Sequence, residues 1–417
     1  MDERRGAGTI AVIGGGASGL AAAIAAARTG AARVTVYEAD ERVGRSILAT
    51  GNGRCNFSNA RIDAGLYWNG AFVGQVFCAA ETLPAQAVGG CAGANSVLRL
   101  FASCGLRWRE EAQGRLLPAT GKASTVLDVL RAAARAAGVR EACGNAVCAV
   151  ELPRREGSPF TLRMADGAFE RADAVIVAAG GRHVLDLLPA DVEVVPFSPV
   201  LGPLKTEVRP IRALDNIRVR CSVRLRRDGA VVAVERGEVL FRKYGVSGIA
   251  VFNLSRFARS GDALEIDLLT EALGLREGAD AAVALAARRD ALANVGMAAT
   301  CCDVLRGAVL PLVAEALCEV AQVDEGAAPT DEALARIAHA GTAFALSVEG
   351  PGDVRQCQAH RGGIAVDALD PQTMALRRTP GLFAAGEAVD VDAPCGGYNL
   401  HWAWASGMVA GWSAARR

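Results

Sequence analysis

Residues Gly14 to Gly19 read Gly-Gly-Gly-Ala-Ser-Gly, which is the pattern G-x-G-x-x-G, between an apolar stretch and an alanine-rich one. Gly14 permits a sharp turn, Gly16 lets the backbone approach a pyrophosphate, and Gly19 lets a following helix pack closely on the preceding strand. N–H groups at the start of that helix would face the anion. Glu38 follows at about the distance at which an acidic side chain binds the hydroxyls of an adenosine ribose. The pattern predicts a dinucleotide site.

The polar stretch from Glu38 to Asn59 indicates which dinucleotide. A nicotinamide dehydrogenase would normally continue with further strand and helix units after the acidic residue, whereas this stretch is dense in Gly, Asn and Arg. Such a loop can wrap a long cofactor, and Arg45 could face its phosphates. The chain carries a single G-x-G-x-x-G, which disfavours separate Rossmann domains for FAD and NAD(P)H. The polar side chains available to the cofactor are those of Asn52, Arg54, Asn56 and Asn59.

The elements around the glycines are predicted from hydrophobic pattern. We expect a buried strand at Thr9–Ile13, a turn at Gly14–Ser18, a helix at Gly19–Thr29 and a second strand at Arg33–Glu38. The run Ile10–Ala27 is apolar enough to resemble a signal peptide or a membrane helix, but its glycines would break either one. We therefore expect an untargeted, cytoplasmic chain.

Length and composition limit the number of folded units and the kinds of partner and metal site to expect. A chain of 417 residues suggests two or three folded units. Lys and Arg (45) balance Asp and Glu (45), so nothing in the charge favours a nucleic-acid partner. Twelve cysteines without C-x-x-C suit a reducing compartment, and four scattered histidines do not suggest a metal site.

The rest of the chain divides into segments that differ in composition and hydrophobic pattern. Val126–Ala137 is predicted to be an amphipathic helix, and the Asp-Gly pairs at 166–167 and 228–229 indicate hairpins. Residues 192–269 look mostly β, and 270–345 are rich in Ala, Leu, Glu and Arg at helical spacing.

Five motifs extend this interpretation: GGGASGLAAA, ATGNGRCNFSN, GRLLPATGKAS, GEVLFRKYGVSG and GLFAAGEAVDVDAPCGGYNLHWAWASG. In order, and over nearly the whole chain, they resemble a bacterial NAD(P)/FAD-dependent oxidoreductase flavoprotein family that includes the bile-acid 3-dehydro-Δ4-reductase type and the aminoacetone oxidase type. The resemblance implies an α/β fold in which a Rossmann-like FAD-binding domain (1–187 and 346–417) is interrupted by a β-barrel-like domain (188–269) and a small helical subdomain (270–345).

The same resemblance implies cofactor contacts, position by position. Gly14, Gly16, Ser18 and Gly19 would meet the pyrophosphate, Glu38 the ribose, Val147 the adenine, and Gly51, Asn52, Gly53, Arg54 and Asn56 the flavin side, while Gly386 and Glu387 would approach the ribityl and pyrophosphate region. The strand end Ala178-Ala179-Gly180 resembles the Ala-Thr-Gly element of such folds, with Ala179 in place of threonine, so no hydroxyl contact is available there.

The glycines before the predicted C-terminal helix could also contact the cofactor. Gly396, Gly397, Tyr398 and Asn399 precede a helical run, so unpaired amides could point at the flavin pyrimidine edge and favour the reduced, negatively charged ring. The same residues suit an ordinary turn before a core helix anchored by tryptophans, and only the resemblance favours the first interpretation.

Three residues are candidates for catalysis. His360 and Arg361 stand where the family more often has a threonine and a small residue, which would place an acid/base group and a cation near the flavin for a substrate with a carboxylate or carbonyl; the alternative is a solvated loop. Tyr244 is a second candidate proton donor, although a packed barrel tyrosine is the commoner role. Cys55 and Cys395 both fall near the expected flavin, but packing is favoured over a redox dithiol.

These observations predict an FAD-dependent oxidoreductase in which NADH or NADPH reduces the flavin, and the flavin reduces an activated C=C bond of a small organic substrate. Two alternatives stay open: an amine or amino ketone oxidase that releases peroxide, and a non-catalytic flavin-binding or RNA-modification accessory protein. No membrane partner is expected, and the oligomeric state is open.

Overall fold

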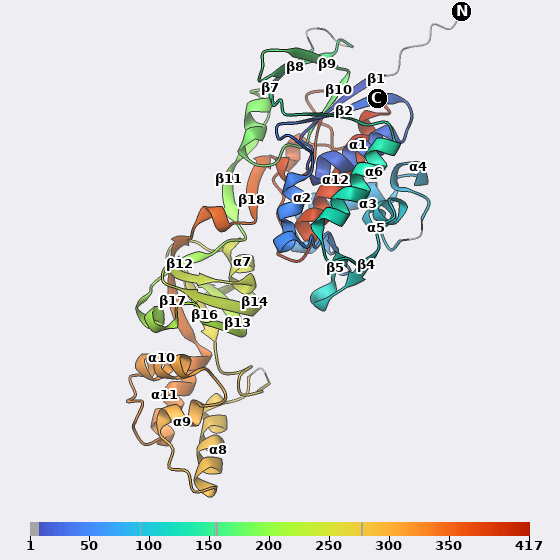
Figure 1. Cartoon of the computed structure of the whole chain (residues 1–417). Helices are drawn as coiled ribbons and strands as arrows, with labels where there is room; N and C mark the ends of the chain where they lie inside the picture. The colour runs from blue at the N-terminus through green and yellow to red at the C-terminus, as the bar shows by residue number, and fades with distance from the viewer. Residues whose placement is uncertain (1–7, 92, 154, 156, 277) are drawn as a thin grey trace, which may run out of the picture. The chain divides into compact units, whose positions relative to one another are not determined.

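The computed structural model describes residues 8–91, 93–153, 155, 157–276 and 278–417, in two compact units (Figure 1). Unit one runs up to Ser198 and resumes at Ala359, and unit two is Pro199–Gln358. Each unit has its own buried apolar cluster. The helical segment predicted at 270–345 therefore shares a unit with the β-rich segment before it.

Unit one is built on a five-stranded parallel sheet. Its strand order is β19-β10-β1-β2-β6. The bounds are β1 (Gly8–Ile13), β2 (Ala32–Glu38), β6 (Arg140–Cys143), β10 (Ala174–Val177) and β19 (Leu382–Ala384). Helix α1 (Ala17–Ala27) joins β1 to β2, which confirms the predicted strand–helix–strand unit. Because the carboxyl ends of parallel strands share one edge, this edge can hold a ligand.

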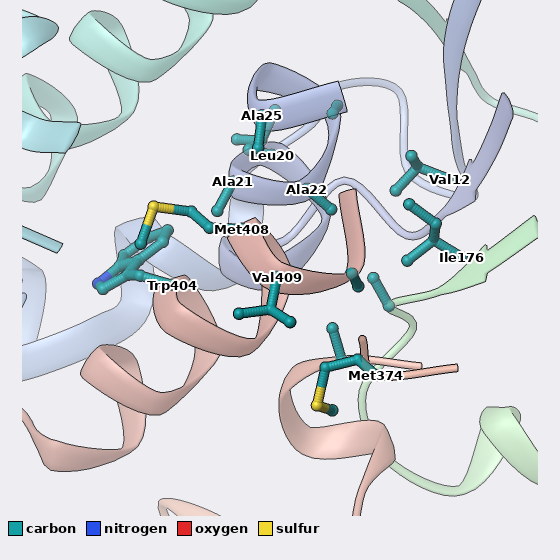
Figure 2. Packing of buried hydrophobic residues seen from close by; sticks show 14 of the residues in the cluster. Val12, Leu20, Ala21, Ala22, Ala25, Ile176, Met374, Trp404, Met408 and Val409 are labelled. Carbon is teal, nitrogen blue, oxygen red and sulfur yellow. The ribbon is translucent and has the colours of Figure 1, made fainter. Parts of the chain in front are cut away.

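Helix α12 (Tyr398–Ala414) packs against α1 through small residues. A Cβ on Gly407 would overlap the carbonyl oxygen of Ser18, and one on Gly411 would overlap that of Ala22. The two backbones can approach this closely only because both positions lack a side chain. Apolar side chains of the two helices pack together, with Met408 and Val409 of α12 near α1 (Figure 2). The start of α1 is thereby fixed by the C-terminal helix.

The other elements of unit one surround this sheet and helix pair. Helix α6 begins three residues before the predicted Val126–Ala137, and the polar stretch predicted as loop contains the short helix α2. The Asp166-Gly167 pair joins two antiparallel strands, β8 and β9, as predicted. The helices are α2 (Arg45–Ala49), α3 (Gly70–Glu81), α4 (Ala85–Val88), α5 (Ser96–Ser103) and α6 (Ala123–Ala136), and the strands are β3 (Ser58–Asn59), β4 (Trp108–Glu110), β5 (Arg115–Pro118), β7 (Val147–Glu151), β8 (Phe160–Met164), β9 (Phe169–Ala172), β11 (Val194–Val200) and β18 (Ala359–Ile364).

Unit two contains a closed antiparallel barrel of order β12-β15-β14-β13-β16-β17. Asp228 (φ 49°) and Gly229 (φ 80°) turn β13 into β14, which confirms the second hairpin, because both central residues of such a turn need positive φ. The strands are β12 (Leu204–Thr206), β13 (Arg218–Arg227), β14 (Ala230–Arg242), β15 (Gly245–Ser247), β16 (Ala263–Asp267) and β17 (Phe344–Pro351).

Helices complete unit two. The predicted helical segment forms α8 (Ala281–Asn294), α9 (Cys301–Leu305), α10 (Pro311–Ala321) and α11 (Asp331–Thr342). Helix α7 (Ile249–Ser255) lies in the part expected to be strands. Gly248, at φ 102°, ends β15, and α7 then buries Ala250, Val251 and Leu254 at helical spacing, a pattern too short to distinguish from a strand in the sequence.

Among the residues described, no helix combines the length and apolar character that crossing a membrane requires. The apolar run that resembles a membrane segment is instead β1, the glycine turn and α1. All twelve cysteines are free thiols.

Candidate dinucleotide-binding site

The glycine turn follows β1 at the carboxyl edge of the sheet. Gly14 has φ 101°, its N–H donates to the carbonyl oxygen of Tyr37 at 2.8 Å, and a Cβ there would lie 2.8 Å from the carbonyl oxygen of Ala178. A Cβ on Gly19 would overlap the carbonyl oxygen of Gly14. The first and last glycines of the motif are therefore required for the turn itself.

Gly16 is different, because its surroundings are open. Its φ of −77° suits any residue, and a Cβ there would meet only the Ser46 hydroxyl oxygen, at 3.3 Å. Gly16 is the N-cap of α1, and no side chain caps the N–H groups of that first turn. Ser18 is buried beside Gly386. An open cradle before uncapped N–H donors fits a phosphate group.

Glu38 lies at the end of β2 beside this cradle. One carboxylate oxygen accepts the N–H of Gly15 at 2.8 Å and the other accepts that of Asp40 at 3.0 Å. The carboxylate is thus held by backbone amides and keeps lone pairs for further donors. The exposed Arg45 pairs with Asp40 at 2.9 Å. Val147 begins β7, a few residues after the end of β6, the sheet neighbour of β2.

The segment 51–56 adopts an unusual backbone. Gly51, Asn52, Gly53 and Cys55 all have positive φ, between 53° and 78°. Arg54, within this run, pairs with Glu111. The segment ends at Asn56, whose carboxamide oxygen is buried without a hydrogen-bond partner among the described residues. An unpaired buried acceptor fits a ligand that brings a donor.

The start of α12 lies beside this acceptor. Gly397 is the N-cap with φ 96°, and a Cβ on it would lie 2.9 Å from the Asn56 carboxamide oxygen. Asn399 bonds with its side chain to both the N–H and the carbonyl of Ala393, at 2.9 and 2.8 Å. The side chain predicted to meet the cofactor therefore closes the loop before α12, and the backbone of the first turn is what remains for a ligand. Asn59 donates to the Gly396 carbonyl at 2.9 Å and holds the same loop.

His360 and Glu387 form a pair near the end of β10. Glu387 accepts the backbone N–H of His360 at 3.0 Å, and its carboxylate lies 3.6 Å from the ring Nδ1. Both side chains are about 40% exposed, so the ring can exchange protons with solvent. A Cβ on Gly180 would lie 3.1 Å from the Glu387 carboxylate, which brings 179–180 to this pair.

Arg361 has a different environment. Its guanidinium binds both oxygens of the fully buried Asp392 at 2.6 and 3.1 Å, and it stacks 4.0 Å over the Trp68 ring. Nearby, Asp390 accepts from the Asn69 side chain and from the Gly362 N–H. Sequence reasoning missed Trp68, Asn69 and both aspartates, although two acids in the short apolar run VDVDAP signal buried partners.

Tyr244 belongs to unit two, so it is described with the barrel. It is partly buried in the turn between β14 and β15, and its carbonyl accepts the N–H of Thr206, the last residue of β12, at 3.2 Å. The other predicted site residues lie in unit one. Unit one also has a cavity of about 570 Å³ at the start of α3, lined among others by Asn69, Phe72 and Gln75.

Burial controls two titratable groups close to the site. Burial raises the pKa of the Cys55 thiol to about 11, which keeps it protonated and poorly reactive. Burial lowers the pKa of His401 to about 3; a hydrogen bond of 2.8 Å joins its ring to Ser58. Both groups act in packing, as expected for Cys55.

A Rossmann-like parallel sheet with an open glycine cradle at its carboxyl edge defines a dinucleotide-binding protein of the Rossmann type, with a barrel unit inserted in the chain. The sequence matches the family described as "HI0933-like protein Rossmann domain" over residues 8–413, and the chain belongs to that family. It is thus a member of a flavoprotein oxidoreductase family, and the resemblance drawn from the sequence motifs is confirmed.

The chain is similar to proteins of known name over most of its length. The chain is 32% identical to a 3-dehydro-bile acid delta(4,6)-reductase of Clostridium scindens, over 98% of this chain and 99% of that protein. It is 26% identical to a ribosomal RNA dihydrouridine synthase of Escherichia coli, over 95% of each. A solved structure of E. coli quinol fumarate reductase FrdA aligns with a TM-score of 0.43 at 16% identity, over 98% of this chain and 70% of that one.

Proposed function

We propose that this protein is an FAD-dependent reductase that takes electrons from NADH or NADPH and reduces an activated C=C bond of a small organic substrate. The observation that carries the proposal is the full-length similarity to a 3-dehydro-bile acid delta(4,6)-reductase. In that name, delta denotes the C=C bonds that are reduced. The product named for the second relative, dihydrouridine, is a nucleoside whose pyrimidine ring has its C=C bond saturated. Both names describe the same class of reaction.

FAD, when bound, would supply hydride transfer. The chain would hold it along the carboxyl edge of the sheet. The cradle at Gly16 and the first turn of α1 would bind the pyrophosphate, and Glu38 would accept from ribose hydroxyls with its remaining lone pairs. Asn56 and the first turn of α12 would meet the flavin ring.

The proton that completes the reduction needs a donor, and His360 and Tyr244 are our candidates. His360 pairs with Glu387 and reaches solvent, which are the properties of a group that can be reprotonated after each turnover. Arg361, in contrast, is committed to Asp392 and Trp68, so we assign it a positioning role. It fixes the chain beside His360 and the loop that leads to α12.

An anaerobic titration tests the proposal. The purified protein should show a flavin absorbance spectrum, NADH or NADPH should bleach it, and a conjugated enone should restore it. Bleaching only by amines, followed by peroxide release in air, would show an oxidase instead. Bound FAD that no donor reduces would show a non-catalytic protein.

The substrate class is tested in the same cuvette. Because positive and negative side chains balance in the chain, we expect the small enone, and not a uridine-containing RNA fragment, to reoxidise the flavin. Reoxidation by the RNA fragment would place the activity with the second relative.

A further inference from the structure

The carboxamide oxygen of Asn56 is a buried acceptor with no partner among the described residues. Leaving such a group unpaired is unfavourable, because the hydrogen bond it made to water in the unfolded chain is lost on burial. The backbone before it is committed to the left-handed conformation at Asn52 and Cys55, which non-glycine residues rarely adopt. The fold therefore holds this oxygen in place at a conformational cost.

Hydrogen-bond donors lie directly beside this acceptor. Gly397, whose missing Cβ would lie 2.9 Å from the Asn56 oxygen, is the N-cap of the 17-residue helix α12. No side chain caps α12, so the N–H groups of its first turn are available to a ligand. The loop is fixed by Asn59 and Asn399, which bond to Gly396 and Ala393.

One acceptor next to a row of donors is complementary to the edge of a cyclic imide, in which an N–H group stands beside a carbonyl. The pyrimidine ring of a flavin has such an edge, with N3–H between two carbonyl groups. We propose that the Asn56 carboxamide oxygen accepts the flavin N3–H, while the first turn of α12 donates to an adjacent carbonyl oxygen. This inference rests on the proposed binding of FAD and deepens it by naming the residue that accepts the imide N–H.

The test pairs a change in the protein with a change in the cofactor. Apoprotein is titrated with FAD and with N3-methyl-FAD, which lacks the N3–H, and both dissociation constants are read from flavin fluorescence. The wild type should bind FAD at least tenfold more tightly. In Asn56→Ala, which removes the acceptor and makes room for the methyl group, the preference should fall to near one.

Other results would overturn the proposal in distinguishable ways. Equal binding of both flavins by the wild type, or a preference that persists in Asn56→Ala, would show that another group faces N3. Failure of the wild type to bind FAD at all would remove the proposed function as well. The thermal midpoint of the apoprotein should change little in Asn56→Ala, because the carboxamide oxygen makes no hydrogen bond among the described residues; a large fall together with an unchanged flavin preference would show a structural role instead.

The flavin potential gives a second readout. Asn56→Asp keeps the shape and the acceptor but adds a negative charge, which should disfavour the reduced ring and shift the midpoint potential to more negative values. The matched control is Asn216→Asp in unit two, where the side chain pairs with Arg242 and the potential should not move. An unchanged potential in Asn56→Asp would count against contact with the ring.

Discussion

At the scale of single residues, a substitution at Gly16 can distinguish an effect on cofactor binding from an effect on folding. Its backbone suits any residue, and an added Cβ would meet only the Ser46 hydroxyl, so Gly16→Ala should change the thermal midpoint of the apoprotein little. The same methyl group would occupy the cradle before α1, where the pyrophosphate is proposed to bind. We therefore expect FAD affinity to fall by roughly tenfold or more, which corresponds to about 1.4 kcal/mol of binding free energy.

The measurement compares FAD titrations and thermal unfolding of apoprotein for wild type and variant. Gly74→Ala in α3 is the matched control, because its Cβ would make an ordinary 3.5 Å contact with Ala64. It should bind FAD like the wild type. Unchanged affinity in Gly16→Ala would show that the pyrophosphate does not lie there.

His401 makes the stability of the fold dependent on pH in a known direction. Burial lowers the pKa of His401 to about 3, whereas an unfolded histidine titrates near pH 6.5. Between these values the unfolded chain binds a proton that the folded chain does not. The free energy of unfolding therefore falls on acidification through this window, by up to about 1.4 kcal/mol per pH unit from this group.

Replacing this histidine isolates its contribution. His401→Gln keeps a hydrogen-bonding group near Ser58 and removes the titration. Urea unfolding at pH 8, 6.5 and 5 should show a shallower loss of stability for the variant than for the wild type. Identical slopes would mean that other groups dominate the acid response.

At the scale of elements, the crossing of α1 and α12 is set by two glycines. Alanine is favoured over glycine inside a helix by about 1 kcal/mol, but here its methyl group would overlap the carbonyl oxygen of Ser18 or Ala22. We expect overpacking to prevail, so that Gly407→Ala and Gly411→Ala each destabilise the fold by about 1–3 kcal/mol in chemical denaturation.

The two positions should differ in their effect on the cofactor. Gly407 faces Ser18 in the first turn of α1, whereas Gly411 lies one helical turn further from the cradle. Only Gly407→Ala should also weaken FAD binding. Gly74→Ala again serves as the control and should be neutral or stabilising. Unaltered stability in both crossing variants would contradict this packing.

Sequence reasoning succeeded where a local pattern determines the structure. The glycine turn between β1 and α1 and the two Asp-Gly hairpins depend on neighbours in the chain, and all three are found. It failed for α7, whose burial pattern is too short to define a period. It could not pair Arg361 with Asp392 and Trp68, because nothing in the sequence says that such distant positions meet.

At the scale of the whole molecule, unit two is one continuous span with its own core. The backbone N–H of Gln358 donates to the carbonyl of Leu201 at 3.1 Å, so the span begins and ends at neighbouring points. A closed barrel leaves no open sheet edge. We predict that Pro199–Gln358 expressed separately unfolds cooperatively and does not bind FAD.

The complementary fragment should retain the cofactor. In unit one, β11 pairs with β18, so the ends left by excision lie side by side and a short glycine linker can join them. We expect this excised form to bind FAD, as measured by flavin fluorescence. Aggregation of the separate barrel, or loss of FAD from the excised form, would show that each unit needs the other to fold.

The position of β19 and α12 after the barrel in the chain has a consequence for biosynthesis. Helix α12, which packs closely along α1, is synthesised only after the whole barrel has been translated. The small-residue face of α1 that α12 covers stays exposed during that interval. A nascent chain stalled near residue 380 should therefore recruit chaperones more strongly than the released protein.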